Sequence, residues 1–158
     1  MLVLQEAPKV EVASSSVGPY PPGSTIGMLG SGQLGRMFTH AAQQLGYRVH
    51  VFSTHVDSPA GQAADKEIAG RYDDCDALAE FAAGVDVVTL EFENVPVSAV
   101  EEIGRHVPVR PGPDALRTVQ HRLREKQFLQ DAGVGCTPFR PVTDLDGLQN
   151  ALEGLGYP

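Results

Sequence analysis

Residues 27–37, GMLGSGQLGRM, decide which fold this chain is expected to adopt. Gly30, Gly32 and Gly35 give a G-x-G-x-x-G spacing, which follows a short apolar run and precedes a segment with helical periodicity. Glycines at such a strand-to-helix turn allow a tight bend and let a ligand approach the helix N-terminus. Glycine also serves turns that only pack, so the loop by itself leaves a ligand-binding role and a structural role open.

Outward from this loop, the hydrophobic pattern alternates between strand and helix. Such alternation predicts a parallel sheet with crossover helices, of the doubly wound, Rossmann-like α/β class. The run VDVVTLEF at residues 85–92 predicts a central, buried strand. The first helix has one apolar face, made of Leu34, Met37, Phe38, Ala41 and Leu45. The expected strands cover residues 25–30, 48–53, 66–70, 85–92, 107–111 and 137–142. The expected helices cover 33–46, 73–84, 95–106 and 144–156, and residues 113–133 are expected to form one or two helices.

Composition limits what the chain can do. Its 158 residues are 42% hydrophobic and 20% charged, which suffices for one ordinary domain and a remainder. No apolar run is long enough for a transmembrane helix, and a net charge of −8 disfavours binding to nucleic acid or to an anionic membrane. Cys75 and Cys136 lie far apart without metal-ligand spacing, so neither a disulfide framework nor a zinc site is expected, and a cytoplasmic location fits best.

The sequence divides into four parts. Residues 1–24 are rich in Pro, Gly and Ser, which predicts a disordered leader. Residues 25–112 hold the Rossmann-like domain, and residues 113–136 form connecting helices with Asp114 as a cap. Residues 137–158 are typical of the opening of a second domain. Because a strand needs a partner and a helix needs a surface to cover, this last part predicts that the chain is a fragment of a longer protein.

Two positions bear on which ligand the glycine loop accepts. A dinucleotide site needs an acid about 20 residues further on, at the end of the second strand, and Ser53 stands there, so an NAD site is disfavoured. Glu91 and Glu93 instead flank Phe92 at the end of the fourth strand, the edge where open α/β sheets bind ligands. Alternation predicts both acids on one face, where a carboxylate could accept hydrogen bonds from ribose hydroxyls or a substrate amine. Asn94 is expected to cap the next helix.

Six stretches carry a more specific resemblance, because they occur in the order and at the spacing of one enzyme family. Together they cover the chain from residue 25 to its end and resemble 5-(carboxyamino)imidazole ribonucleotide synthase, an ATP-grasp enzyme family of purine biosynthesis. The stretches are GSGQLGRM, YRVHV, DSPAGQAAD, YDD, EFENVP and RLREKQFL. The resemblance implies a Rossmann-like pre-ATP-grasp domain, followed by the start of the ATP-grasp part that clamps ATP.

The implied reaction is an ATP-dependent carbon–nitrogen ligation. Bicarbonate is phosphorylated to carboxyphosphate, and the carboxylate passes to the exocyclic amine of aminoimidazole ribonucleotide, with Mg²⁺ and cationic side chains offsetting the charge on the transferred phosphoryl group. ATP and Mg²⁺ are thus the implied cofactors, bound mainly outside this chain, which is expected to be inactive alone. The implied partners are these small molecules, with no nucleic acid or membrane, and a homodimer is expected at full length. A formate-dependent glycinamide ribonucleotide formyltransferase-like enzyme and a non-catalytic nucleotide-binding Rossmann module remain open alternatives.

The resemblance also implies roles for single residues. It places the loop against the ribonucleotide substrate, and we expect the two acids of the fourth strand to join it there, so that the substrate-binding residues are Gly32, Gln33, Leu34, Glu91 and Glu93. Arg122 matches an arginine that contacts ATP, although His121 stands where the family commonly has Asp. Solvated positions for Gln33 and Arg122 and a core position for Leu34 are the alternatives. The formylating relative carries an acid at position 33, and a neutral amide there suits the near-neutral amine of aminoimidazole.

Overall fold

The structure, a computed structural model, describes residues 19–155. These residues fall into two compact units, residues 19–117 and residues 118–155. Most of the leader expected over residues 1–24 lies outside the described residues. Its last residues contact the first unit, because the Tyr47 hydroxyl donates to the Tyr20 carbonyl at 2.9 Å and the Gly23 N–H donates to the Gly46 carbonyl at 2.7 Å.

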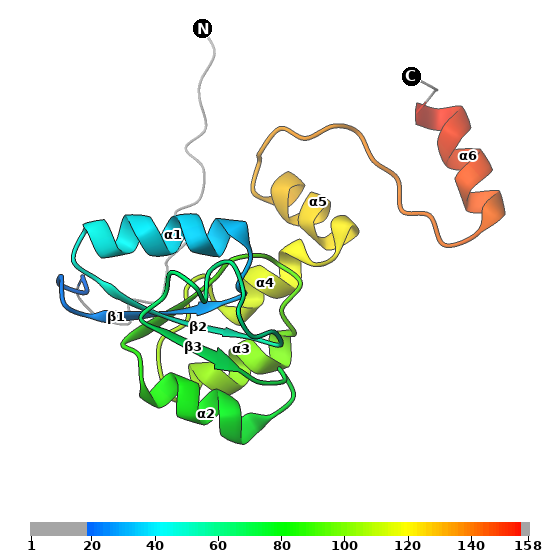
Figure 1. The fold of residues 1–158 in the computed structure, drawn as a ribbon. Coiled ribbons are helices and arrows are strands. Elements are labelled where there is room, and N and C mark those ends of the chain that lie inside the picture. The colour runs from blue at the N-terminus through cyan, green and yellow to red at the C-terminus, as the bar shows by residue number, and fades with distance from the viewer. Residues whose placement is uncertain (1–18, 156–158) are drawn as a thin grey trace, which may run out of the picture. The chain divides into compact units, whose positions relative to one another are not determined.

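A four-stranded parallel sheet in the order β3-β2-β1-β4 forms the centre of the first unit (Figure 1). β1 lies between β2 and β4, with Met28 opposite Val51 on one side and opposite Thr89 on the other. The predicted Rossmann-like α/β fold with a parallel sheet is confirmed. The strands are β1 (Thr25–Leu29), β2 (Arg48–Ser53), β3 (Lys66–Ala69) and β4 (Val87–Leu90).

Helices cover both faces of this sheet (Figure 1), as the crossovers of parallel strands require. α1 (Gln33–Gln44) lies on one face, and α2 (Cys75–Ala83) and α3 (Val97–Gly104) lie on the other. Asp74 caps α2 by accepting the Ala77 N–H at 3.0 Å, and Gly84 ends the helix. Each face has its own buried cluster, with Met28, Ala42, Val49, Val51 and Ala60 on the α1 side and a larger set including Leu29, Phe52, Leu78, Phe81, Val100 and Ile103 on the other.

Of the apolar face predicted for α1, only Phe38 packs against the buried cluster on this side of the sheet. Leu34 and Met37 are 65% and 67% exposed, and small residues point inward instead. One reason is the close approach of the helix to the loop after β2, since a Cβ added to Gly35 would lie only 3.1 Å from the Ala60 Cβ. The buried residues of α1 are Gly35, Thr39 and Ala42.

β4 also differs from its prediction. It is the last strand in the sheet order and not a central one, and it ends at Leu90, before the two acids. An isolated bridge between Val88 and Val109 is all that forms of the strand predicted over residues 107–111, because Pro108 and Pro111 have no N–H to donate. Residues 107–111 nevertheless shield β4, which explains the apolar sequence of β4.

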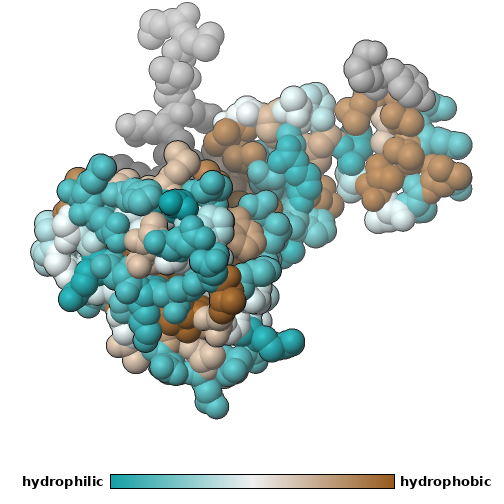
Figure 2. Space-filling model, viewed as in Figure 1, coloured by the Kyte–Doolittle hydropathy of each residue, from teal (hydrophilic) through white to brown (hydrophobic). Residues whose placement is uncertain are grey.

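The remaining helices carry the chain into the second unit. α4 (Pro113–Val119) buries Leu116 in the first unit, and Asp114 lies inside its first turn and does not cap it. Asn94 is likewise not a cap, since Pro96 is the N-cap of α3. In the second unit, α5 (Arg122–Asp131) and α6 (Leu145–Leu155) have no buried residues, and apolar side chains gather on the visible face of α6 (Figure 2).

The prediction of a strand over residues 137–142 is wrong. This segment forms no strand, and within residues 118–155 no other strand is available to pair with it. Among residues 19–155, none of the helices has the length and apolar character needed to cross a bilayer.

Candidate functional site

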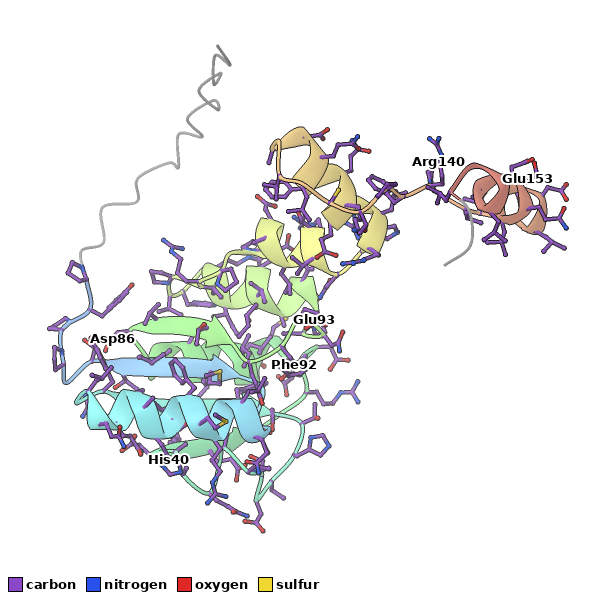
Figure 3. The ribbon with its side chains drawn as sticks, turned by 90° about the horizontal axis from the view of Figure 1, so that it is seen from above. His40, Asp86, Phe92, Glu93, Arg140 and Glu153 are labelled. Carbon is purple, nitrogen blue, oxygen red and sulfur yellow. The ribbon has the colours of Figure 1, made fainter. Side chains whose placement is uncertain are left out.

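A cavity of about 560 Å³ opens at the carboxyl edge of the sheet. The loops that follow all four strands line it, through residues 30–32 and 34, residues 53–59, Tyr72, and residues 91–92. In open parallel sheets, ligands bind at this edge, at the point where the strand order reverses, which here lies between β1 and β4. Figure 3 shows Phe92 and Glu93 at this edge and Asp86 at the opposite end of β4.

Glu91 occupies the inside of the glycine loop. Its carboxylate accepts the Gly32 N–H at 2.7 Å and the Gly35 N–H at 3.1 Å, two donors at the N-terminus of α1. A Cβ added to Gly30, Gly32 or Gly35 would lie 2.7, 2.6 or 3.2 Å from a carboxylate oxygen of Glu91. The glycines of the G-x-G-x-x-G spacing therefore make room for a side chain of the same chain.

The end of β2 carries a serine whose hydroxyl is used within the chain. Ser53 is 4% exposed, accepts the Ser31 hydroxyl at 2.8 Å and accepts the His55 N–H at 3.2 Å. It thereby links the glycine loop to the loop after β2. The position that would contact ribose in a dinucleotide site is buried and already hydrogen-bonded.

The loop after β2 forms one wall of the cavity and is anchored by Glu67 of β3. The Glu67 carboxylate accepts the Asp57 N–H at 2.9 Å, the Ser58 N–H at 3.0 Å and the Ser58 hydroxyl at 2.5 Å. The hydrogen bond from the Ser58 hydroxyl is the main cause that holds the pKa of Glu67 below its ordinary value. Glu67 is therefore ionised at neutral pH and fixes this wall.

Tyr72 supplies a neutral phenol to the cavity. Its ring packs on Phe52 with the ring centroids 5.7 Å apart, and its hydroxyl lies 3.5 Å from the Phe52 carbonyl. Burial raises the pKa of Tyr72 to about 12, and the charge of Glu91 acts in the same direction. The phenol is protonated at neutral pH, and its hydroxyl donates a long hydrogen bond to the Phe52 carbonyl.

The structure brings together some of the predicted substrate-binding residues. Gly32, Leu34 and Glu91 line the cavity, whereas Gln33 and Glu93 are exposed and do not line it. Alternation along the strand had predicted Glu91 and Glu93 on one face, and this prediction is wrong. The chain leaves the strand geometry after Leu90, so the two acids lie in different environments. Glu91 is half-buried against the loop while Glu93 faces outward.

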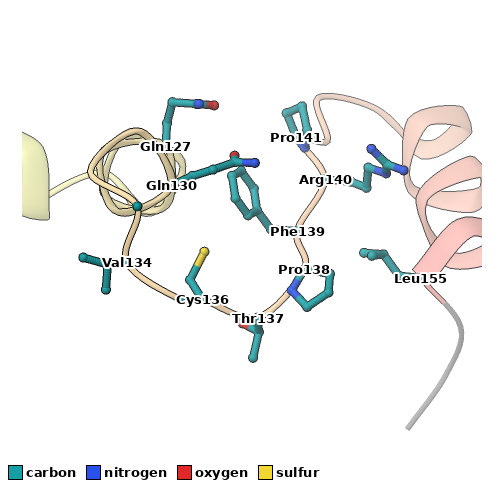
Figure 4. A pocket seen from close by; sticks show the side chains of 12 residues that line it. Gln127, Gln130, Val134, Cys136, Thr137, Pro138, Phe139, Arg140, Pro141 and Leu155 are labelled. Carbon is teal, nitrogen blue, oxygen red and sulfur yellow. The ribbon is translucent and has the colours of Figure 1, made fainter. Parts of the chain in front are cut away.

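Arg122 belongs to the second unit, where it begins α5. Its guanidinium pairs with Glu125 at 2.5 Å. Together with Lys126 and Arg140 it lines a hollow of about 770 Å³, and three cations along one hollow suit an anionic ligand. A second hollow of this unit, about 630 Å³, lies between the end of α5, residues 133–141 and Leu155 (Figure 4).

Sequence reasoning missed Ser58, Glu67 and Tyr72 as parts of the site. Ser58 and Tyr72 do lie in two of the stretches that carried the resemblance, DSPAGQAAD and YDD, so a signal was present without a role attached. Glu67 gave no signal, because one acid in a short alternating strand is ordinary. In residues 19–155, no group of three or more His, Cys, Asp or Glu side chains could hold a metal ion.

These features define a Rossmann-like α/β domain with a ligand cavity at its sheet edge and a glycine loop closed by one of its own carboxylates. A family model described as the ribonucleotide synthetase preATP-grasp domain matches residues 24–120, and the chain belongs to this family.

Curated relatives narrow the comparison. The chain is 48% identical over 135 residues to the N5-carboxyaminoimidazole ribonucleotide synthase of Brucella melitensis, an alignment that covers 85% of this chain and 37% of the relative. It is 41% identical over 136 residues to the synthase of the same name from Staphylococcus saprophyticus, covering 86% of this chain and 36% of that one. The chain thus spans little more than a third of the length of these relatives.

Solved structures agree with these relatives. The N5-carboxyaminoimidazole synthetase of Staphylococcus aureus complexed with ADP has a TM-score of 0.80 and 37% identity, over 88% of this chain and 37% of that chain. The Aspergillus clavatus synthase in complex with ADP and 5-aminoimidazole ribonucleotide has a TM-score of 0.77 and 34% identity, over 87% of this chain and 37% of that chain.

Proposed function

We propose that the protein containing this chain is an ATP-dependent ligase that carboxylates 5-aminoimidazole ribonucleotide with bicarbonate, through carboxyphosphate. The observation that carries the proposal is the sheet-edge cavity, on a fold shared at a TM-score of 0.77 with a synthase bound to ADP and this ribonucleotide. We place the reaction in purine biosynthesis with a homodimer at full length, as the resemblance implies, and in the cytoplasm, as the two distant cysteines favour.

The chemistry of the cavity supports a role in holding the sugar and heterocycle of the substrate. Its lining offers the protonated Tyr72 phenol, the Thr54 hydroxyl and one carboxylate. Among the described residues that line it there is no Lys or Arg, and a phosphate group needs such cations or free N–H donors. We therefore propose that the substrate phosphate is bound by other parts of the protein, while Gln33 and Glu93 contact the ribonucleotide from the rim.

Arg122 belongs to the ATP side of the proposal. Its hollow, shared with Lys126 and Arg140, is lined by cations that match the charge of a triphosphate. We propose that Arg122 contacts ATP and that Mg²⁺ enters with ATP on acids outside residues 19–155, since these residues hold no suitable cluster.

The test is ADP release by the full-length protein. With both aminoimidazole ribonucleotide and bicarbonate we expect release, and omitting either should abolish it. The Gln33→Glu variant should use aminoimidazole ribonucleotide less well, because the neutral amide is replaced by a charge. Release only with formate and glycinamide ribonucleotide would assign the formylating reaction instead, and no release with either pair would refute a ligase.

The 158-residue chain alone is the matched negative control, and we expect no turnover from it. ADP effects on melting without any turnover at full length would favour a non-catalytic nucleotide-binding module.

A further inference from the structure

The N-terminus of α1 has no cap of its own. Its N-cap residue is Gly32, which lacks a side chain, and its first turn carries no acid. A helix start with unsatisfied N–H groups and a positive dipole end favours a nearby negative charge. Here that charge comes from Glu91, which lies 59 positions further along the chain and accepts the Gly32 N–H.

The geometry around Glu91 matches what a glycine loop usually does for a ligand. In dinucleotide-binding domains, the glycines let a pyrophosphate approach the backbone and the N-terminus of the following helix. In this chain, two carboxylate oxygens take the donated N–H groups of Gly32 and Gly35 at 2.7 and 3.1 Å. At each of the three loop glycines, an added Cβ would lie 3.2 Å or less from an oxygen of that carboxylate.

We propose that Glu91 is an internal anion that replaces a ligand phosphate at the glycine loop. It is a positioning residue, because it fixes the loop and the start of α1 while keeping this helix end closed to the phosphate of any ligand. The proposal concerns atoms of this chain only, so it does not depend on the ligase activity proposed above.

A double-mutant cycle tests the positioning role. Gly32 has φ −81° and ψ −159°, a backbone conformation open to alanine, so Gly32→Ala should destabilise the chain through overlap with Glu91, where the added Cβ would lie 2.6 Å from an oxygen, in addition to the smaller N-cap preference for glycine over alanine, which is the same in every background. We expect Gly32→Ala to lower the urea midpoint clearly in the wild-type background and much less in a Glu91→Ala background. In a Glu93→Ala background, which removes an equal charge two residues away, the full loss should remain. An equal loss in all three backgrounds would overturn the proposal.

Pyrophosphate tests the exclusion. Inorganic pyrophosphate, at ionic strength matched with NaCl, should leave the melting temperature of the wild type and of Glu93→Ala unchanged. It should raise that of Glu91→Ala in a concentration-dependent way, because two N–H donors and the helix dipole are released. Glu91→Gln, which keeps the size of the side chain, repeats the measurement should Glu91→Ala fail to fold. The exclusion would be overturned if the melting temperature of the wild type rose as much as that of the Glu91 variants. It would also be overturned if neither Glu91→Ala nor Glu91→Gln showed a rise.

Discussion

Replacing Glu67 measures how strongly one acid of β3 holds the wall of the cavity. Glu67→Ala removes the acceptor of three hydrogen bonds, from the Asp57 N–H, the Ser58 N–H and the Ser58 hydroxyl. Hydrogen bonds to a charged group contribute about 1.5–3 kcal/mol each when buried. Asp57 is exposed and Glu67 is only half-buried, so water can replace part of each hydrogen bond when the acceptor is removed. We therefore take about 1 kcal/mol for the contribution of each hydrogen bond.

We therefore expect Glu67→Ala to lower the free energy of unfolding by about 2–3 kcal/mol, or the melting temperature by roughly 10–20 °C for a unit of about 100 residues. Urea titration followed by far-ultraviolet circular dichroism measures the loss. Ser58→Ala, which removes one of the three donors, should lose about 1 kcal/mol. A loss below about 0.5 kcal/mol in Glu67→Ala, the range of ordinary surface substitutions, would show that water replaces these bonds and would refute the reasoning.

The contact with Gly61 and the pH dependence sharpen this prediction. A Cβ added to Gly61 would overlap the Glu67 carboxylate, so Gly61→Ala should destabilise the wild type and cost much less beside Glu67→Ala. Because the folded-state pKa of Glu67 lies below its ordinary 4.5, its contribution is present above about pH 4.5 and is lost as the pH falls through the folded value. The gap between wild type and Glu67→Ala should accordingly narrow only below that pH.

Three further substitutions probe other parts of the unit. Burial lowers the pKa of His50 from 6.5, and its Nδ1 has no hydrogen-bond partner among the described residues, so His50 takes up its proton at higher pH in the unfolded state than in the folded state. The stability of the wild type should therefore fall as the pH drops below about 6.5. In His50→Gln, the urea midpoint should change less between about pH 5 and 7 than it does in the wild type. In an absorbance titration, the Tyr72 phenol should ionise near pH 12, and Glu91→Gln should lower its pKa but leave it above 10, because burial is the larger cause. Gly27→Ala should cost about 1–3 kcal/mol by urea titration, since its Cβ would lie 2.7 Å from the Phe81 ring; an unchanged midpoint would contradict the packing.

The elements that sequence predicts well are those whose signals are local. β2 was predicted at its observed bounds, because a β-branched and aromatic run is bounded by polar residues. α2 was predicted over residues 73–84, within two residues of its observed bounds, because its end signals, Asp74 and Gly84, act within one turn of the helix. The packed face of α1 was not predictable in this way. Periodicity gives an apolar face, but the small residue Gly35 lets the helix approach closely on a different one.

The site shows the same limit at longer range. That Glu91 would lie at the carboxyl edge followed from its place after an apolar strand, and the structure puts it there. Its hydrogen-bond partners could not be predicted, since Gly32 lies 59 positions away and offers only backbone N–H groups, which leave no mark in a sequence pattern. The Ser58 contact to Glu67 is equally invisible for the same reason.

In this chain the G-x-G-x-x-G loop marks the place where a negative group approaches a helix N-terminus, and that group belongs to the chain itself. In a dinucleotide-binding domain, the acid stands after the second strand and the phosphate lies in the loop. Here Ser53 stands after the second strand, and the acid after β4, Glu91, lies in the loop. On the role proposed for Glu91, its place in the loop has a physical reason, because a domain that does not hold its ligand's phosphate at this loop needs a charge of its own to complete the helix start. A glycine loop should therefore be interpreted only after asking which acid of the chain can reach it.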